Sequence, residues 1–163
     1  MLRQFVAVSA IFALTACGGS EPVPTGSDNG GNPEMAIAGV SYSVSEAYVR
    51  KPLDGQSSTA AYFILQSNTE NNSLVFNVTT DIAETAELHS HDMSGGMMQM
   101  RKLENVELKA GETVEFAPFG YHIMLFNVSG GLETGDNARI TLDIFSNGNT
   151  ERISFDAPIK PLN

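Results

Sequence analysis

Residues 60–79 read AAYFILQSNTENNSLVFNVT and carry the clearest secondary-structure signal of the chain. Ala60–Gln66 and Ser73–Thr79 are runs of apolar, aromatic and β-branched residues, which favour strands. The polar segment Ser67–Asn72 between them has the composition of a turn. The two runs are therefore predicted to form a hairpin or to lie as adjacent strands.

Over most of the remaining chain, apolar and polar residues alternate with a period of two, as in β-strands. Val40, Tyr42 and Val44 alternate with serines, which predicts a strand buried on one face. Further strand candidates lie at residues 83–91, 97–103, 113–116, 122–128, 138–146 and 151–155. No sustained helical period is present. About eight or nine short strands separated by turns predict an all-β domain, an antiparallel β-sandwich or barrel.

Length and charge restrict the classes of function. With 163 residues, of which 42% are hydrophobic, the chain is long enough for one domain with a proper core. Its formal net charge of −10 repels nucleic acid and anionic lipid. Nucleic acid is therefore not an expected partner.

The N-terminus has the features of a secretory signal. Arg3 precedes the apolar run Phe5–Ala13, which is too short to span a membrane as a mature helix. Leu14-Thr15-Ala16-Cys17 follows and resembles the cleavage box of bacterial lipoproteins. This resemblance implies a signal peptide over residues 1–16 and lipid on Cys17. The chain is then expected at the periplasmic face of a bacterial membrane. Gly18, in place of an aspartate that would suggest inner-membrane retention, favours the outer membrane.

Residues 17–34 are expected to be a lipid-anchored tether. Their glycine, proline, serine, asparagine and acidic residues offer almost nothing to bury. The β domain is then expected over residues 35–163. Cys17 is the single cysteine, so with its sulfur lipidated no thiol remains for a disulfide, for nucleophilic catalysis or for a metal.

His89–Met124 gathers the residues with metal-binding chemistry. It holds all three histidines and five of the seven methionines. Thioether sulfur and imidazole nitrogen suit monovalent copper, because a soft ion prefers soft donors. On regular strands His122 and Met124 share a face, and so do Glu87, His89 and His91, and Met98 and Met100. Ser94-Gly95-Gly96 offers a turn between the last two groups.

The spacing of these donors resembles a known family. His89, ten intervening residues, Met100, twenty-one intervening residues and then His122-Ile123-Met124 match the His-x10-Met-x21-His-x-Met signature of the periplasmic PCu(A)C copper chaperone family. The resemblance implies a cupredoxin-like β fold and a copper(I) ion held by His89, Met100, His122 and Met124. It also implies delivery of copper to an accepting protein, towards the binuclear copper centre of a haem-copper oxidase.

Other interpretations remain open for individual residues and for the whole chain. His91, Met93 and Met98 are candidates for accessory ligands, although an exposed loop or core packing also explains them. His89 and His91 also suit zinc. A blue-copper carrier would need a cysteine ligand, and hydrolysis would leave the methionines unexplained, so the chain is not expected to be an enzyme. The rival classes are a copper-buffering or resistance lipoprotein and a lipid-anchored β-sandwich that binds proteins without metal.

Overall fold

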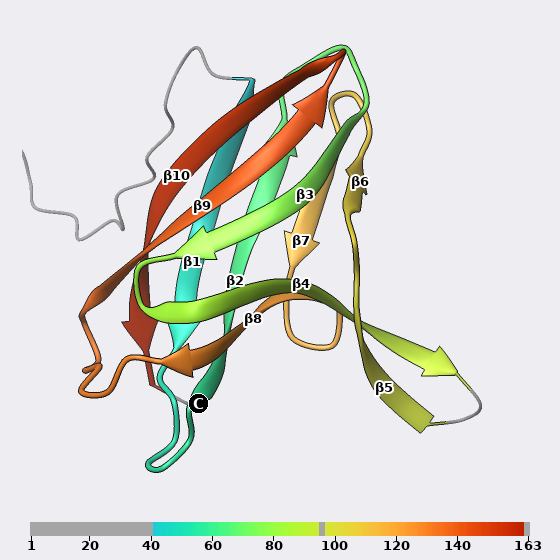
Figure 1. Cartoon of the computed structure of the whole chain (residues 1–163). Helices are drawn as coiled ribbons and strands as arrows, with labels where there is room; N and C mark the ends of the chain where they lie inside the picture. The colour runs from blue at the N-terminus through green and yellow to red at the C-terminus, as the bar shows by residue number, and fades with distance from the viewer. Residues whose placement is uncertain (1–40, 95–96, 162–163) are drawn as a thin grey trace, which may run out of the picture. The chain divides into compact units, whose positions relative to one another are not determined.

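The computed structural model describes residues 41–94 and 97–161, which all belong to one compact unit, Asn32–Asn163 (Figure 1). The expected signal peptide, the lipidation site Cys17, the tether and the start of the β domain at residue 35 lie outside the described residues. No described helix is long and apolar enough to cross a membrane.

The described residues form ten strands, as an all-β fold requires. Period-two sequence runs give most of the long strands, because each such run has an apolar face to bury, whereas the strand at residues 58–67 is a continuous apolar run with five consecutive buried residues. The strands are β1 (Tyr42–Arg50), β2 (Ser58–Ser67), β3 (Ser73–Thr80), β4 (Ala83–Ser94), β5 (Met97–Lys102), β6 (Val106–Leu108), β7 (Thr113–Phe116), β8 (Tyr121–Val128), β9 (Asn137–Ser146) and β10 (Asn149–Lys160).

These strands form one curled sheet that folds over into two layers, in the order β5-β4-β8-β7-β2-β1-β10-β9-β3-β6 (Figure 1). The first six strands of this order make one layer and the last four make the other. The layers are joined where β1 pairs with β10 in parallel, at Val49 opposite Ile159. The remaining pairs are antiparallel, except for a single parallel contact between β7 and β8. The predicted antiparallel β-sandwich is confirmed.

The predicted pairing of Ala60–Gln66 with Ser73–Thr79 is wrong. β2 pairs with β1, β7 and β8, whereas β3 pairs with β6 and β9 in the other layer. Both strands turn apolar side chains into the core, Phe63 and Leu65 from β2 and Val75 from β3. A polar connection of this length easily spans the roughly 10 Å between packed layers, so it crosses between the sheets instead of closing a hairpin.

The layer that contains β4, β5 and β8 positions the chemistry-bearing residues. Leu88 of β4 and Ile123 and Leu125 of β8 are buried in the core. Because neighbours along a strand point to opposite faces, the residues next to these three, His89, His122 and Met124, point to the other face of the sheet. Beyond the core, β4 and β5 project as an extended hairpin (Figure 1).

Candidate metal centre

Cross-strand register brings the predicted metal ligands onto one surface. On β4 and β8, His89 lies directly opposite His122, and Glu87 lies opposite Met124. On β4 and β5, His91 lies opposite Met100. Directly opposed residues in a sheet share a face. We call the surface formed by these six residues, Glu87, His89, His91, Met100, His122 and Met124, the donor face.

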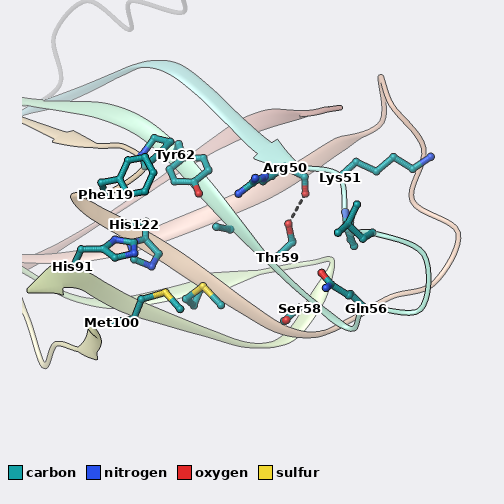
Figure 2. A pocket seen from close by; sticks show the side chains of 15 residues that line it. Arg50, Lys51, Gln56, Ser58, Thr59, Tyr62, His91, Met100, Phe119 and His122 are labelled. Carbon is teal, nitrogen blue, oxygen red and sulfur yellow. Dashed lines mark hydrogen bonds between the residues drawn. The ribbon is translucent and has the colours of Figure 1, made fainter. Parts of the chain in front are cut away.

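A pocket of about 370 Å³ opens on the donor face. Its lining includes Met100, His122 and Met124, three of the four predicted ligands (Figure 2). Ala60 of β2 lies opposite Met124 and is itself part of the lining. Since a methyl group fills little of the space beside Met124, the small side chain at position 60 helps to leave the pocket open.

The two histidines of β4 both lie close to His122 on the neighbouring strand β8. The ring centroid of His122 is 5.8 Å from that of His89 and 5.0 Å from that of His91. His91 lines the pocket, while His89 is absent from the described lining and lies beside it. The structure therefore places His91, expected only as an accessory ligand, nearer to the methionine donors than the sequence alone indicates.

Hydrogen bonds fix the orientation of two imidazoles. Nδ1 of His122 donates to the carbonyl oxygen of Gly120 at 3.0 Å, and Nε2 of His89 donates to Oε2 of Glu87 at 2.9 Å. Because both partners can only accept, each nitrogen must carry its proton, and the opposite nitrogen keeps a free lone pair. This is the arrangement in which outer partners orient metal-binding histidines.

Three imidazole nitrogens are buried without a partner. Nδ1 of His89, Nδ1 of His91 and Nε2 of His122 have no hydrogen bond within the described part of the chain. A buried polar atom without a partner costs free energy, commonly about 1–3 kcal/mol. One such atom on each of three neighbouring rings is the state expected of ligands whose metal is supplied separately.

Burial keeps His122 neutral. Desolvation lowers the pKa of the His122 imidazole below its usual 6.5, and the neighbouring His91 and His89 lower it further, while the Gly120 carbonyl opposes the shift. The pKa of Glu87 is also lowered, because His89 and Lys102 donate hydrogen bonds to its carboxylate. At neutral pH the donor face thus offers a neutral imidazole at His122 and an ionised carboxylate behind His89.

Harder ligands do not form a site of their own. Within residues 41–94 and 97–161, no three His, Cys, Asp or Glu side chains are placed to hold a metal ion together. A zinc site built on His89 and His91 is therefore not supported by this arrangement. The pocket lining also includes two thioether donors, Met124, which is half-buried, and Met100, which is 58% exposed.

Two accessory candidates are placed only by their backbones. Met93 and Met98 lie opposite each other across the β4–β5 hairpin, and their side chains lie outside the described residues. Sequence reasoning missed Tyr62 and Phe119 in the pocket lining. Nothing in the local sequence links Tyr62 to the site, since Tyr62 comes from β2. Phe119 stands three residues before His122, and this proximity is a signal that could have identified it.

Comparisons with known proteins agree with this fold. A curated relative, Putative lipoprotein Lxx21020 of Leifsonia xyli subsp. xyli (strain CTCB07), is 28% identical over 161 residues, which covers 98% of this chain and 90% of the relative. The apo-DR1885 solution structure from Deinococcus radiodurans matches with a TM-score of 0.55 and 21% identity, over 96% of this chain and 97% of that one.

Solved structures with copper show the same fold. The copper-bound PCuAC domain from PmoF2 matches with a TM-score of 0.62 and 17% identity, over 76% of this chain and 95% of that domain. CuI-DR1885 matches with a TM-score of 0.58 and 24% identity, over 72% of this chain and 76% of that one. The cupredoxin-like fold implied by the PCu(A)C resemblance is confirmed. The family model for putative lipoprotein LpqE-like proteins matches residues 42–159, and the chain belongs to that family.

Proposed function

We propose that this protein is an extracytoplasmic copper(I) carrier whose site is formed by His89, Met100, His122 and Met124. The observation that carries the proposal is the meeting of Met100, His122 and Met124 in one pocket, with the free nitrogen of His89 beside His122. That the fold is shared with copper-bound PCuAC domains supports the same assignment. The protein is not proposed to be an enzyme.

The donor set favours monovalent copper. Two neutral imidazoles and two thioethers bring no negative charge to the ion, and thioether sulfur is a soft ligand. Copper(II) prefers harder nitrogen and oxygen donors, so it is the poorer fit. Because methionine carries no proton, only the imidazoles must be deprotonated for binding, and burial already holds His122 in that state.

The same site suits release. Met100 lies on β5, at one edge of the sheet, and its side chain is largely exposed. An accepting protein can displace this thioether first and then replace the inner ligands one at a time. Delivery towards the copper centre of a haem-copper oxidase is the proposed use. Copper buffering or resistance, without a dedicated acceptor, is the second candidate, because it needs the same site.

A lipid on Cys17 is proposed to hold the carrier at the periplasmic face of a bacterial membrane, with the outer membrane preferred. The family and the curated relative both carry the name of lipoproteins, which supports the anchor. A tether over residues 17–34 would let the donor face approach an acceptor in or near the membrane.

An anaerobic copper(I) competition titration tests the proposal. The chain is used with Cys17→Ser, so that an unlipidated thiol cannot bind copper. We expect tight binding of one copper(I) ion by this parent and loss of that binding in the Met100→Leu, Met124→Leu variant. Met35→Leu is the matched control, because it removes a thioether where no ligand is proposed. Circular dichroism checks that each variant is folded, and a folded parent that fails to compete for copper(I) would overturn the proposal.

A further inference from the structure

His91 has the placement of a ligand, although the spacing signature passes over it. It lies directly opposite Met100 in the β4–β5 ladder, and it lines the pocket together with Met100, His122 and Met124. In Figure 2 the rings of His91 and His122 lie side by side, next to Met100. Their centroid separation of 5.0 Å is shorter than the 5.8 Å between His89 and His122.

The polar atoms of His91 support a binding role. Its Nδ1 is buried and has no hydrogen-bond partner within the described residues, as is also true of one nitrogen of each other histidine. A histidine that served only the fold would be expected to satisfy a buried ring nitrogen, because leaving it unpaired costs free energy. In the tautomer protonated at Nε2, Nδ1 of His91 has a lone pair that can bind an ion.

A strained aromatic residue borders His91. The Phe119 ring centroid is 5.8 Å from that of His91, and the Phe119 side chain is 73% exposed. Its φ of 69° lies in the left-handed region, which is unfavourable for a bulky side chain. Burial does not explain this strain, since the ring gains little by leaving water. Strained backbone of this kind concentrates at functional sites, and here it places a ring against His91.

We infer that His91 is a fifth copper ligand, which exchanges with His89 on the same ion while His122 and the methionines keep hold of it. This inference rests on the proposed function. His89, bonded to Glu87, is the inner imidazole, and His91, opposite the exposed Met100, is the outer one. Exchange of one neutral imidazole for another leaves the charge of the complex unchanged. Copper can therefore move towards the exposed edge without ever being held by fewer than three donors.

A double-variant cycle tests the exchange. Copper(I) affinity is measured for the Cys17→Ser chain and for His89→Ala, His91→Ala and both together. If either imidazole can replace the other, each single variant keeps much of the affinity, and the double variant loses at least roughly tenfold more than the two single losses combined. If His91 is not a ligand, His91→Ala binds like the parent and the double variant binds like His89→Ala.

Nitrogen NMR of the parent provides a readout that needs no substitution. Copper(I) should shift the Nδ1 resonance of His91 as well as the resonances of His89 and His122. An unshifted His91 nitrogen, or a double variant that binds copper(I) as tightly as His89→Ala, would overturn the inference and leave the proposed function standing. A parent that binds no copper would overturn the proposed function itself.

Discussion

His89 and His122 face each other across the β4–β8 ladder, and each donates a hydrogen bond through one ring nitrogen, while the other nitrogen is buried and has no partner among residues 41–94 and 97–161. The acceptors differ: Glu87 is a carboxylate and Gly120 a backbone carbonyl. Only the Glu87 carboxylate can be removed by a substitution, because the Gly120 acceptor belongs to the main chain. This difference makes the contribution of the outer partner to copper binding measurable.

Glu87→Gln should weaken copper(I) binding while leaving every ligand in place. In the parent, the Glu87 carboxylate orients His89 and strengthens its free nitrogen as a metal donor, and the substitution removes this charged acceptor. Changes of this kind typically cost about 10–100-fold in metal affinity. Competition titration measures the loss. Glu84→Gln is the matched control, because Glu84 is on the same strand but bonds to Asn127. Equal affinity in both variants would contradict the role given to Glu87.

Phe119→Gly should stabilise the copper-free domain. Glycine accepts a positive φ without steric cost, so we expect a gain of about 1 kcal/mol in the free energy of unfolding, measured by urea denaturation. Asn147→Gly is the control, since Asn147 has a φ of 49° but asparagine tolerates this region, and its effect should be smaller. A destabilised Phe119→Gly variant would show that the ring contributes to folding and not only to the pocket.

Ala60→Leu should block copper without removing a donor. Ala60 lies opposite Met124 in the pocket wall, so a larger side chain fills the space that the ion would occupy. We expect copper(I) affinity to fall while the melting temperature changes little. The neighbouring Ala61→Leu points into the core instead, and overpacking there should cost about 1–3 kcal/mol in stability. Unchanged affinity in a folded Ala60→Leu variant would place the ion elsewhere.

Acid should destabilise the copper-free domain partly through Asp143. Arg152 and then Asn77 donate hydrogen bonds to its carboxylate and hold the pKa of Asp143 below its usual 3.8. A carboxyl with a lowered pKa in the folded state contributes stability above pH 3.8, and this contribution is lost as pH falls through the folded-state pKa.

The Asp143→Asn variant isolates this contribution. At neutral pH it should lose about 1–2 kcal/mol of unfolding free energy, and its stability should fall less steeply below pH 4 than that of the parent. Denaturation curves across pH measure both effects. Asp156→Asn is the control, because its ion pair with Arg139 is exposed and contributes little. A parallel pH dependence in the Asp143→Asn variant and the parent would contradict the assignment.

Local patterns were sufficient to predict nine of the ten described strands, because strands are runs of β-branched and aromatic residues, and a strand buried on one face alternates apolar and polar residues. They were not sufficient to predict which strands pair. Ala60–Gln66 and Ser73–Thr79 look like a hairpin, yet contacts far apart in the chain place them in opposite layers. β6 escaped prediction because its three residues are too few to show a period.

The candidate site, like the fold, was predicted only in part from the sequence. The donor spacing identified Met100, His122 and Met124, which the structure brings into one pocket. The spacing could not show that His91 lies closer to His122 than His89 does, because side-chain directions on a twisted hairpin depend on the neighbouring strands. Tyr62 reaches the pocket only through the β2–β8 pairing, which no short motif encodes.

The donor face depends on ladder register alone, since its side chains come from three strands joined edge to edge. Deleting one residue from β4, between Leu88 and His91, would turn the following part of the strand over and send one histidine into the core. Changes in the lengths of connecting loops would not alter which residues of each strand lie on the donor face. The proposed copper site should therefore tolerate insertions between strands but not insertions or deletions of an odd number of residues within them, because only the latter change which side chains face the pocket.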